Sequence, residues 1–385
     1  LRTDYREETP LDKVLVLRWL RKSYLFEKVY ATMFEDPFIQ QLIDDFLDAI
    51  HLRQLAHCQA LLAMLQEQAA TNDKVAPWCD YLSGILTFEI DQDWAAAERI
   101  FTTLSRQPSP ALPQGRVLYA LGCTLEMQGR WQEAIQVYKE ALTLPQTADD
   151  IAECVKLWKE IATCYCEEYM QGDGNHSSLR RGEEFCQQAL AALEAITDTS
   201  PRLMWLQGSI WNTLGAIYRY SGQWAQAAIC YRHDLAICET LDDRHGMGIS
   251  YLNLGEVYHH RNGADATDED WSQAMGFYQE ALALLRQYKN SHLEADVLQN
   301  LGSLQQAMGN PQAALDFYQA AVAVIEDLRT RISAAEARSG FFATVIGTYS
   351  KLVPLLIATG DIAAAFDMVE RARSRSFLEI LGNQP

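Results

Sequence analysis

The sequence predicts an all-α fold, a right-handed superhelical solenoid of antiparallel helix pairs. Three observations predict it: an eight-residue phrase recurs along the chain, its apolar residues lie three and four positions apart, and a turn signature separates the helices of each pair. The strongest copies of the phrase begin at Trp211, Tyr251 and Leu298 and read large-x-x-Leu-Gly. Apolar residues at this spacing share one face of an α-helix, and recurrence of the whole unit indicates stacked repeats.

A glycine at the same place in each copy indicates close packing of the two helices. Gly costs about 1 kcal/mol relative to Ala inside a helix. It is therefore expected where a neighbouring helix leaves no room for a side chain, as at Gly215, Gly255 and Gly302. The partner helix carries Ala-x-x-x-Tyr-x-x-Ala, whose Tyr is expected to fill the groove between adjacent pairs. Its strongest copies are Ala134, Tyr138 and Ala141; Ala274, Tyr278 and Ala281; and Ala314, Tyr318 and Ala321.

The turn between the two helices has a signature of its own. It reads Gly129-Arg130-Trp131, Gly222-Gln223-Trp224 and Gly309-Asn310-Pro311 in three copies. Gly can adopt the left-handed conformation that ends a helix, and Pro or an N-cap residue favours the start of the next one. Each copy is thus predicted to be a helix, a tight turn and a second helix.

The combined pattern, large-x-x-Leu-Gly-x-x-Tyr followed by Ala-x-x-x-Tyr-x-x-Ala, resembles the tetratricopeptide repeat. Weaker copies extend it in both directions, and the earliest has one extra residue in its turn. Neighbouring anchors are 38 to 53 residues apart, whereas the standard repeat has about 34 residues. Longer helices or longer loops are therefore expected, similar to the roughly forty-residue repeats of kinesin light chains. The anchors are Gly84, Gly122, Ala162, Gly215, Gly255, Gly302 and Val353.

Three regions are predicted along the chain. Residues 1–73 form an N-terminal helical capping region, with two long helices from Leu11 to Phe34 and from Phe38 to Gln68. Residues 74–334 form the repeat solenoid, and residues 335–385 form the last helix pair and a junction toward a missing C-terminal domain. A terminal cap needs one polar outer face. An independent docking role for the N-terminal helices is the alternative.

Charge and composition exclude several function classes. The chain has 32 basic and 51 acidic residues, a net charge of −19, which opposes binding of nucleic acid through a broad surface. Arg371, Arg373 and Arg375 form a basic cluster, which is interpreted as a solvated helix end that complements the helix dipole. No stretch approaches 18 consecutive apolar residues, so no membrane contact is expected.

The nine cysteines predict a reducing compartment. None forms a Cys-x-x-Cys pair, and the odd count with scattered spacing is unlike a disulfide framework. Most occupy positions that hold Ala in other copies, while Cys186 stands where other copies have Tyr. We therefore expect small buried hydrophobic residues and a cytoplasmic protein.

The search for catalytic chemistry gives a negative result. The chain has no phosphate-binding Gly-rich loop, no His-Glu-x-x-His and no Gly-x-Ser-x-Gly. His259 and His260, followed by four carboxylates in residues 265–270, are the nearest approach to a metal site, and a solvated insertion between helices is the simpler interpretation. Cys164 and His176 suggest a nucleophile and a base, but nothing in the sequence orients them. No active site, metal or cofactor is expected.

The concave groove of the solenoid, lined by the first helix of each pair, is the predicted binding site for a protein or peptide. With the large residue of the phrase counted as position four, position six holds Thr213, Asn253 and Asn300. An amide both donates and accepts, so a row of amides can bind the backbone of an extended peptide. The alternative is that these side chains are hydrated or bond to the adjacent helix. The predicted peptide-binding residues are Asn212, Thr213, Arg219, Asn253, Glu256, His259, Gln299, Asn300 and Ser303.

The C-terminal region carries a second resemblance. Arg338-Ser339-Gly340-Phe341-Phe342, a further repeat, and then Glu370 to Leu381 are similar to the junction where bacterial repeat arrays meet a CHAT domain, a caspase-like cysteine protease fold. The resemblance implies that the catalytic domain would begin near Pro385 and that its His and Cys dyad lies outside these residues. The chain would then be the sensing or regulatory segment of a larger protein. The alternative is a stand-alone adaptor that assembles a multiprotein complex.

Overall fold

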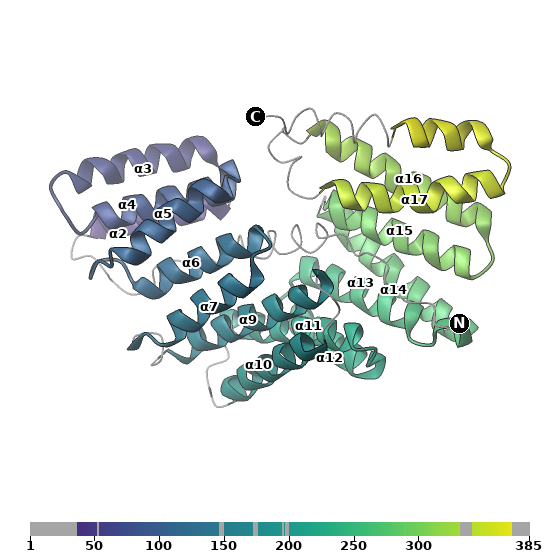
Figure 1. The fold of residues 1–385 in the computed structure, drawn as a ribbon, viewed down its shortest axis with the longest axis horizontal. Helices are drawn as coiled ribbons and strands as arrows, with labels where there is room; N and C mark the ends of the chain where they lie inside the picture. The colour runs from purple at the N-terminus through teal and green to yellow at the C-terminus, as the bar shows by residue number, and fades with distance from the viewer. Residues whose placement is uncertain are drawn as a thin grey trace. The chain divides into compact units, whose positions relative to one another are not determined.

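The structure is a computed structural model in which every regular element of the described part is a helix. The described residues are 37–51, 54–145, 150–171, 176–194, 196, 200–288, 290–331 and 341–371. Helices that follow one another along the chain pack together as pairs. The predicted all-α fold of stacked helix pairs is confirmed (Figure 1).

The helices divide into two compact units, and the division follows Asp198. It falls within the predicted array 74–334, between the anchors Ala162 and Gly215, where the anchor spacing is longest at 53 residues. The N-terminal unit contains α2 (Pro37–His51), α3 (Leu55–Ala69), α4 (Ala76–Leu86), α5 (Trp94–Arg106), α6 (Gln114–Met127), α7 (Trp131–Leu142), α9 (Ile151–Gln171) and α10 (His176–Glu194).

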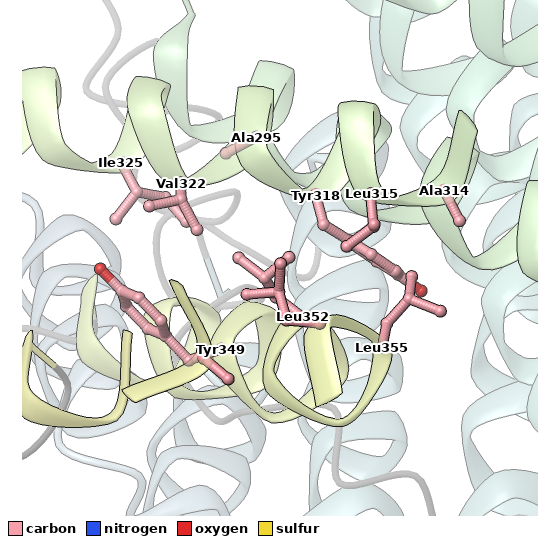
Figure 2. Packing of buried hydrophobic residues seen from close by; sticks show 11 residues of the cluster. Ala295, Ala314, Leu315, Tyr318, Val322, Ile325, Tyr349, Leu352 and Leu355 are labelled. Atoms are coloured by element: carbon pink, nitrogen blue, oxygen red, sulfur yellow. The ribbon is translucent and has the colours of Figure 1, made fainter. Parts of the chain in front are cut away.

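The C-terminal unit repeats one packing arrangement. The second helix of each pair packs against the first helix of the next pair, as α12 does on α13, α14 on α15 and α16 on α17. Figure 2 shows this contact between α16 and α17, where Leu315 and Val322 face Leu352 and Leu355. The unit contains α11 (Pro201–Tyr220), α12 (Trp224–Thr240), α13 (Arg244–His260), α14 (Asp268–Gln287), α15 (Ser291–Ala307), α16 (Pro311–Arg331), α17 (Phe341–Ala358) and a final helix over residues 362–371.

The turns within the pairs have the predicted conformation. Gly129, Gly222 and Gly309 have φ angles of 73°, 72° and 77°, and Gly360 in the last pair has 88°. These values lie in the left-handed region, which Gly enters without steric cost. Pro311 begins α16, where its missing N–H costs no helical hydrogen bond.

The glycine anchors are sites of close helix packing, as predicted. A Cβ atom added to Gly122, Gly215, Gly255 or Gly302 would lie within 2.7 Å of a buried tyrosine ring. The four rings belong to Tyr138, Tyr231, Tyr278 and Tyr318. Each ring packs on the glycine of its own pair, and the Tyr318 ring also belongs to a buried cluster with Leu352 and Leu355 of the next pair.

In the earliest pair, α4 and α5, the extra residue is accommodated in a π-helical turn. Residues Thr87–Asp91 follow α4 as a π-helix, which holds one more residue per turn than an α-helix. Gln92 then takes the left-handed conformation, with φ 53°, at the place where other pairs have Gly. The predicted one-residue insertion is therefore present and does not disturb the packing of Phe101 on Gly84.

The N-terminal region differs from the prediction. The expected long helix from Phe38 to Gln68 is two helices, α2 and α3, because the chain reverses between them. Reversal lets the apolar faces of the two helices cover each other, and Phe46 and Leu65 are fully buried. One straight helix would have left both faces in water. The other predicted helix, Leu11 to Phe34, lies outside the described residues.

Longer helices contribute to the longer spacing of the repeats, and so does the long connection between α13 and α14, in agreement with the two expected sources. α9 and α16 each have 21 residues, and α11 and α14 each have 20. The residues of the CHAT-like junction before Phe341 and after Arg371 lie outside the described part of the chain. The boundaries at residues 73 and 334 remain predictions.

Candidate functional site

The nine predicted binding residues lie on the first helices of three pairs in the C-terminal unit. We call the surface formed by α11, α13, α15 and α17 the first-helix face. Two of these helices have polar caps, since the Asp243 carboxylate accepts from the Gly246 N–H at 2.9 Å and the Asn290 side chain from the Leu293 N–H at 3.2 Å. Caps of this kind satisfy backbone donors at a helix start and fix where the helix begins. Because each helix begins at a fixed residue, the positions of the functional side chains along it are also fixed.

Two of the nine predicted binding residues, both on α11, make hydrogen bonds inside the protein. The Asn212 amide donates to Asp234 Oδ2 at 2.7 Å, and the same carboxylate oxygen accepts from Ser250 Oγ at 2.8 Å. Asp234 thereby links α11, α12 and α13 within the core. The Thr213 hydroxyl donates to the Ser209 carbonyl at 3.0 Å. Asn212 and Thr213 are buried, so their side chains lie beneath the first-helix face.

Two further predicted residues, on α13 and α15, are also buried. Gln299 Oε1 accepts from the Thr348 hydroxyl of α17 at 2.8 Å, which joins two neighbouring first helices. His259 lies 3.4 Å from the Tyr278 hydroxyl through Nδ1 and stacks on His260. Burial, followed by the charges of His260 and Lys351, lowers the pKa of His259 to about 3. The His259 ring is therefore neutral at physiological pH.

Three predicted residues form a hydrogen-bonded ladder across three consecutive first helices. Glu256 of α13 accepts from Arg219 of α11 at 2.9 Å and from the amide of Asn300 of α15 at 3.1 Å. The two carboxylate oxygens take one partner each. Arg219 also donates to the Tyr220 hydroxyl at 2.9 Å and lies over the Tyr220 ring. The ladder holds the three side chains in place and neutralises the Arg219 charge.

Ser303 belongs to a second polar group, and the sequence analysis did not predict the other main member of that group, Lys351. Its hydroxyl accepts from Lys351 Nζ at 3.2 Å and lies 3.1 Å from the Tyr318 hydroxyl. Lys351 is position six of α17, two residues after Tyr349, so the same register that selected Asn253 and Asn300 would have found it. The sequence analysis missed Lys351 because it selected amide side chains at position six, and lysine carries an amino group.

One rule connects these contacts. The residue at position nine of one repeat bonds to position six of the next, as Glu256 does with Asn300 and Ser303 with Lys351. For Asn253, the matching position nine is Ala216, which has no polar side chain. Among the described residues Asn253 has no hydrogen-bond partner, and it is half-buried. Its amide is the position-six group left available for a ligand.

Family models identify the repeats. Residues 115–144, 211–244 and 264–327 each match a model described as tetratricopeptide repeat. The chain carries tetratricopeptide repeats. Comparison with curated proteins gave no match.

Solved structures share the tetratricopeptide fold over most of the chain. A signal-transduction ATPase with numerous domains from Pyrococcus horikoshii, which has a tetratricopeptide repeat sensor, is 14% identical with a TM-score of 0.59, covering 94% of this chain and 51% of that chain. The apo form of RapI is 14% identical with a TM-score of 0.56, covering 88% and 98%. A Rap protein complexed with competence and sporulation factor is 11% identical with a TM-score of 0.55, covering 90% and 99%. These likenesses concern the fold.

The insertion between the two helices of the tetratricopeptide pair α13 and α14 is closed by an internal network. Buried Asp270 accepts from the Thr267 N–H at 2.9 Å, from the Thr267 hydroxyl at 2.7 Å and from the Asn262 amide at 2.7 Å. Arg261 donates to the other oxygen at 2.5 Å. These donors bond to both oxygens of the Asp270 carboxylate. The described residues contain no group of three His, Cys, Asp or Glu side chains placed to hold a metal ion.

The tetratricopeptide helices of the N-terminal unit bury carboxylates of their own. Glu126 accepts from the Tyr138 hydroxyl at 2.5 Å, and Glu160 accepts from the Tyr119 hydroxyl at 3.1 Å. Burial raises the pKa of both tyrosines far above the ordinary value, so the hydroxyls remain protonated donors. All nine cysteines are buried, as the core interpretation predicts. In the described part of the chain, no helix has the length and apolar composition to cross a membrane.

Proposed function

We propose that the chain is a non-catalytic binding segment that holds an extended peptide or peptide-like segment of a partner protein on the first-helix face of its C-terminal unit. The observation that carries this proposal is the available amide of Asn253. It lies between Thr213 and Asn300, the equivalent residues of the two neighbouring repeats, and both of these are already hydrogen-bonded. A half-buried amide with a donor and an acceptor can bind a peptide group of an extended chain with both atoms.

The neighbouring groups give the face a defined chemistry. The ladder of Arg219, Glu256 and Asn300 presents fixed polar atoms beside Asn253, and Ser303 with Lys351 adds a hydroxyl and an amino group. Side chains that are held before a ligand arrives lose less conformational entropy on binding. The tetratricopeptide fold shared with the Rap protein that is complexed with competence and sporulation factor supports a binding role.

We further propose that this segment acts in the cytoplasm as the sensing part of a larger protein, with a CHAT-type protease as the regulated domain. The support is the junction pattern in the sequence and the tetratricopeptide repeat sensor of the Pyrococcus horikoshii ATPase, of which the matched part is 51%. A stand-alone adaptor is the second candidate, since the first-helix face alone suffices for that role.

The test uses peptides selected by the chain itself. Random dodecapeptides displayed on phage are selected on the 385-residue chain, and the best binder is synthesised with a fluorophore. Its Kd is then measured by anisotropy against the parent and against Asn253→Ala. We expect Asn253→Ala to weaken binding at least tenfold, because about 1.4 kcal/mol or more is lost when two amide hydrogen bonds disappear. Joining it with Asn300→Ala should abolish binding.

The matched control is Gln279→Ala, an exposed amide on the second helix α14. This variant should bind as the parent does, and circular dichroism should show equal helicity for all variants. Equal affinity of parent and Asn253→Ala would contradict the proposal and would place the ligand elsewhere on the chain.

A further inference from the structure

Asn253 lies beside Ala216 on the first-helix face, between two connections that join α11 to α13. One turn further along both helices, Arg219 donates to Glu256 at 2.9 Å. One turn earlier, the buried Asp234 carboxylate accepts hydrogen bonds from a side chain of each helix. The two helices therefore run side by side in the same direction. Residues 216 and 253 each come three positions before the Arg219 and Glu256 pair, so they face each other across this interface.

The next two interfaces show what Ala216 lacks. At the first of them, Glu256 accepts from the Asn300 amide at 3.1 Å. At the second, the Ser303 hydroxyl accepts from Lys351 at 3.2 Å. In both cases position six donates and position nine accepts. Ala216 is partly exposed and has no atom beyond Cβ, so it offers no acceptor. A ligand that binds there supplies the acceptor that position nine lacks.

The charges that flank Asn253 favour an uncharged ligand group. Arg219 is already paired with Glu256, and the Asp234 carboxylate lies one turn away on the other side. The two connections thus contain one cation and two carboxylates, and the whole chain has a net charge of −19. A ligand carboxylate would meet like charge here, whereas an amide offers a carbonyl acceptor without charge.

We propose, on the basis of the proposed function, that Ala216 is the specificity-determining residue of this site. Its short side chain leaves the Asn253 amide to an uncharged amide of the ligand. That amide belongs to the main chain of a bound peptide or to an Asn or Gln side chain. Ala216→Glu would supply the acceptor from within the protein, as Glu256 does for Asn300, and would close the site.

The first test closes the site from within. The Kd of the phage-selected, fluorophore-labelled dodecapeptide is measured for the parent, for Ala216→Glu and for the matched control Ala236→Glu. Ala236 is exposed on the second helix α12, so the control adds the same charge elsewhere. We expect Ala216→Glu to weaken binding at least tenfold and Ala236→Glu to bind as the parent does. Parent-like binding by Ala216→Glu would overturn the proposal. The proposed function would then stand if Asn253→Ala still weakened binding, and both would fall if it did not.

A second readout needs no ligand. Urea unfolding is compared for Ala216→Glu, for Asn253→Ala and for the double variant. The midpoint of the double variant should be lower than the sum of the two single shifts predicts, because the new carboxylate stabilises the fold through the Asn253 amide. Additive shifts would show that residues 216 and 253 do not bond, and would overturn the proposal.

The ligand class is tested on the parent protein with variants of the selected peptide. Replacing each peptide bond in turn by an ester weakens its carbonyl as an acceptor, and replacing each Asn or Gln by Ala removes a side-chain amide. One of these changes should cost at least tenfold in Kd, and its cost should vanish in Asn253→Ala. A loss with the ester identifies the main chain, and a loss with Ala identifies the side chain. Parent-like binding of every peptide variant, or tighter binding when Glu replaces the residue that carries the amide, would overturn the proposal.

Discussion

At the scale of single residues, the fold depends on complementary sizes across each helix pair. Where the anchor residue of the first helix is Gly, the second helix places an aromatic ring directly over it. The anchor Ala162 has a side chain, and the matching position of its pair is the small residue Cys186. The last pair has Val353 and Val369 at these places. The second helix therefore has an aromatic ring at this position where the anchor is Gly, and a smaller residue where the anchor is Ala162 or Val353.

Gly302→Ala tests this packing. The new Cβ would lie 2.7 Å from Tyr318 Cε1, and the ring is fully buried, so either the ring or a helix must move. We expect a loss of about 1–3 kcal/mol, the usual cost of overpacking. Urea unfolding followed by circular dichroism measures it. Adding Tyr318→Cys, which copies the Ala162 and Cys186 pair, should cost less than the sum of the two single changes.

Gly276→Ala is the opposite case in the same unit. Gly276 is exposed within α14, and an added Cβ would meet no atom within 4 Å. This variant should gain about 0.5–1 kcal/mol, because Ala has less backbone freedom to lose on folding. Equal effects at residues 276 and 302 would show that helix propensity, and not the tyrosine contact, determines the outcome.

At the scale of elements, the tetratricopeptide pairs tolerate insertions that satisfy their own polar groups. The segment between α13 and α14 is longer than the turn within α11 and α12 or within α15 and α16, and it is closed on Asp270 by Thr267, Asn262 and Arg261. The Asp270 and Thr267 side chains also form a capping box that starts α14. A loop with its own hydrogen bonds does not need to be covered by another element.

Asp270 makes the stability of this element depend on pH. The hydroxyl and N–H of Thr267, followed by Asn262 and Arg261, hold the pKa of Asp270 well below its ordinary value. A lowered pKa in the folded state stabilises the fold above the unfolded pKa of about 3.9. This contribution is lost as the pH falls through the lower folded pKa. Thermal unfolding of the parent and Asp270→Asn at pH 6, 4, 3 and 2 should give a difference that shrinks below about pH 4.

The control for this pH series is Asp316→Asn, an exposed carboxylate on α16, the second helix of the following pair. It should change the melting temperature little at any of the four pH values, since exposed charges contribute little to stability. A constant difference between the parent and Asp270→Asn down to pH 2 would rule out ionisation of Asp270 as the source.

At the scale of the molecule, each described pair contacts mainly the pairs beside it within its own compact unit. The two compact units divide after Asp198, and the contacts of α11 to α17 run from each pair to the next. Stability in such arrays is approximately a sum of repeat terms and nearest-neighbour terms. A local change is therefore expected to act mainly within its own unit.

Hydrogen exchange followed by mass spectrometry can test this locality. Gly302→Ala should speed amide exchange in α15, α16 and α17 and leave α4 to α7 unchanged, because the added side chain disturbs only neighbouring interfaces. Gly122→Ala, whose Cβ would meet the Tyr138 ring, should do the reverse. Faster exchange throughout the chain in either variant would indicate one cooperative body and would contradict the nearest-neighbour description.

The sequence alone determined the helix pairs, their turns and the places of close packing. These features arise from local chemistry that repeats: apolar spacing for the helices, Gly at left-handed turns, and small residues where helices touch. The same reasoning failed for α2 and α3, because apolar residues at helical spacing do not show where a chain reverses. That reversal depends on which faces cover one another.

Only the tertiary structure decided which predicted site residues are available. Asn253 and Asn300 are the same residue type at the same position of the repeat, yet Asn300 bonds to Glu256 and Asn253 has no partner in the described structure. The difference lies in the preceding repeat, where one position nine is Glu256 and the other is Ala216. A hydrogen bond needs both groups within about 3 Å, and that distance is set by how the helices stack.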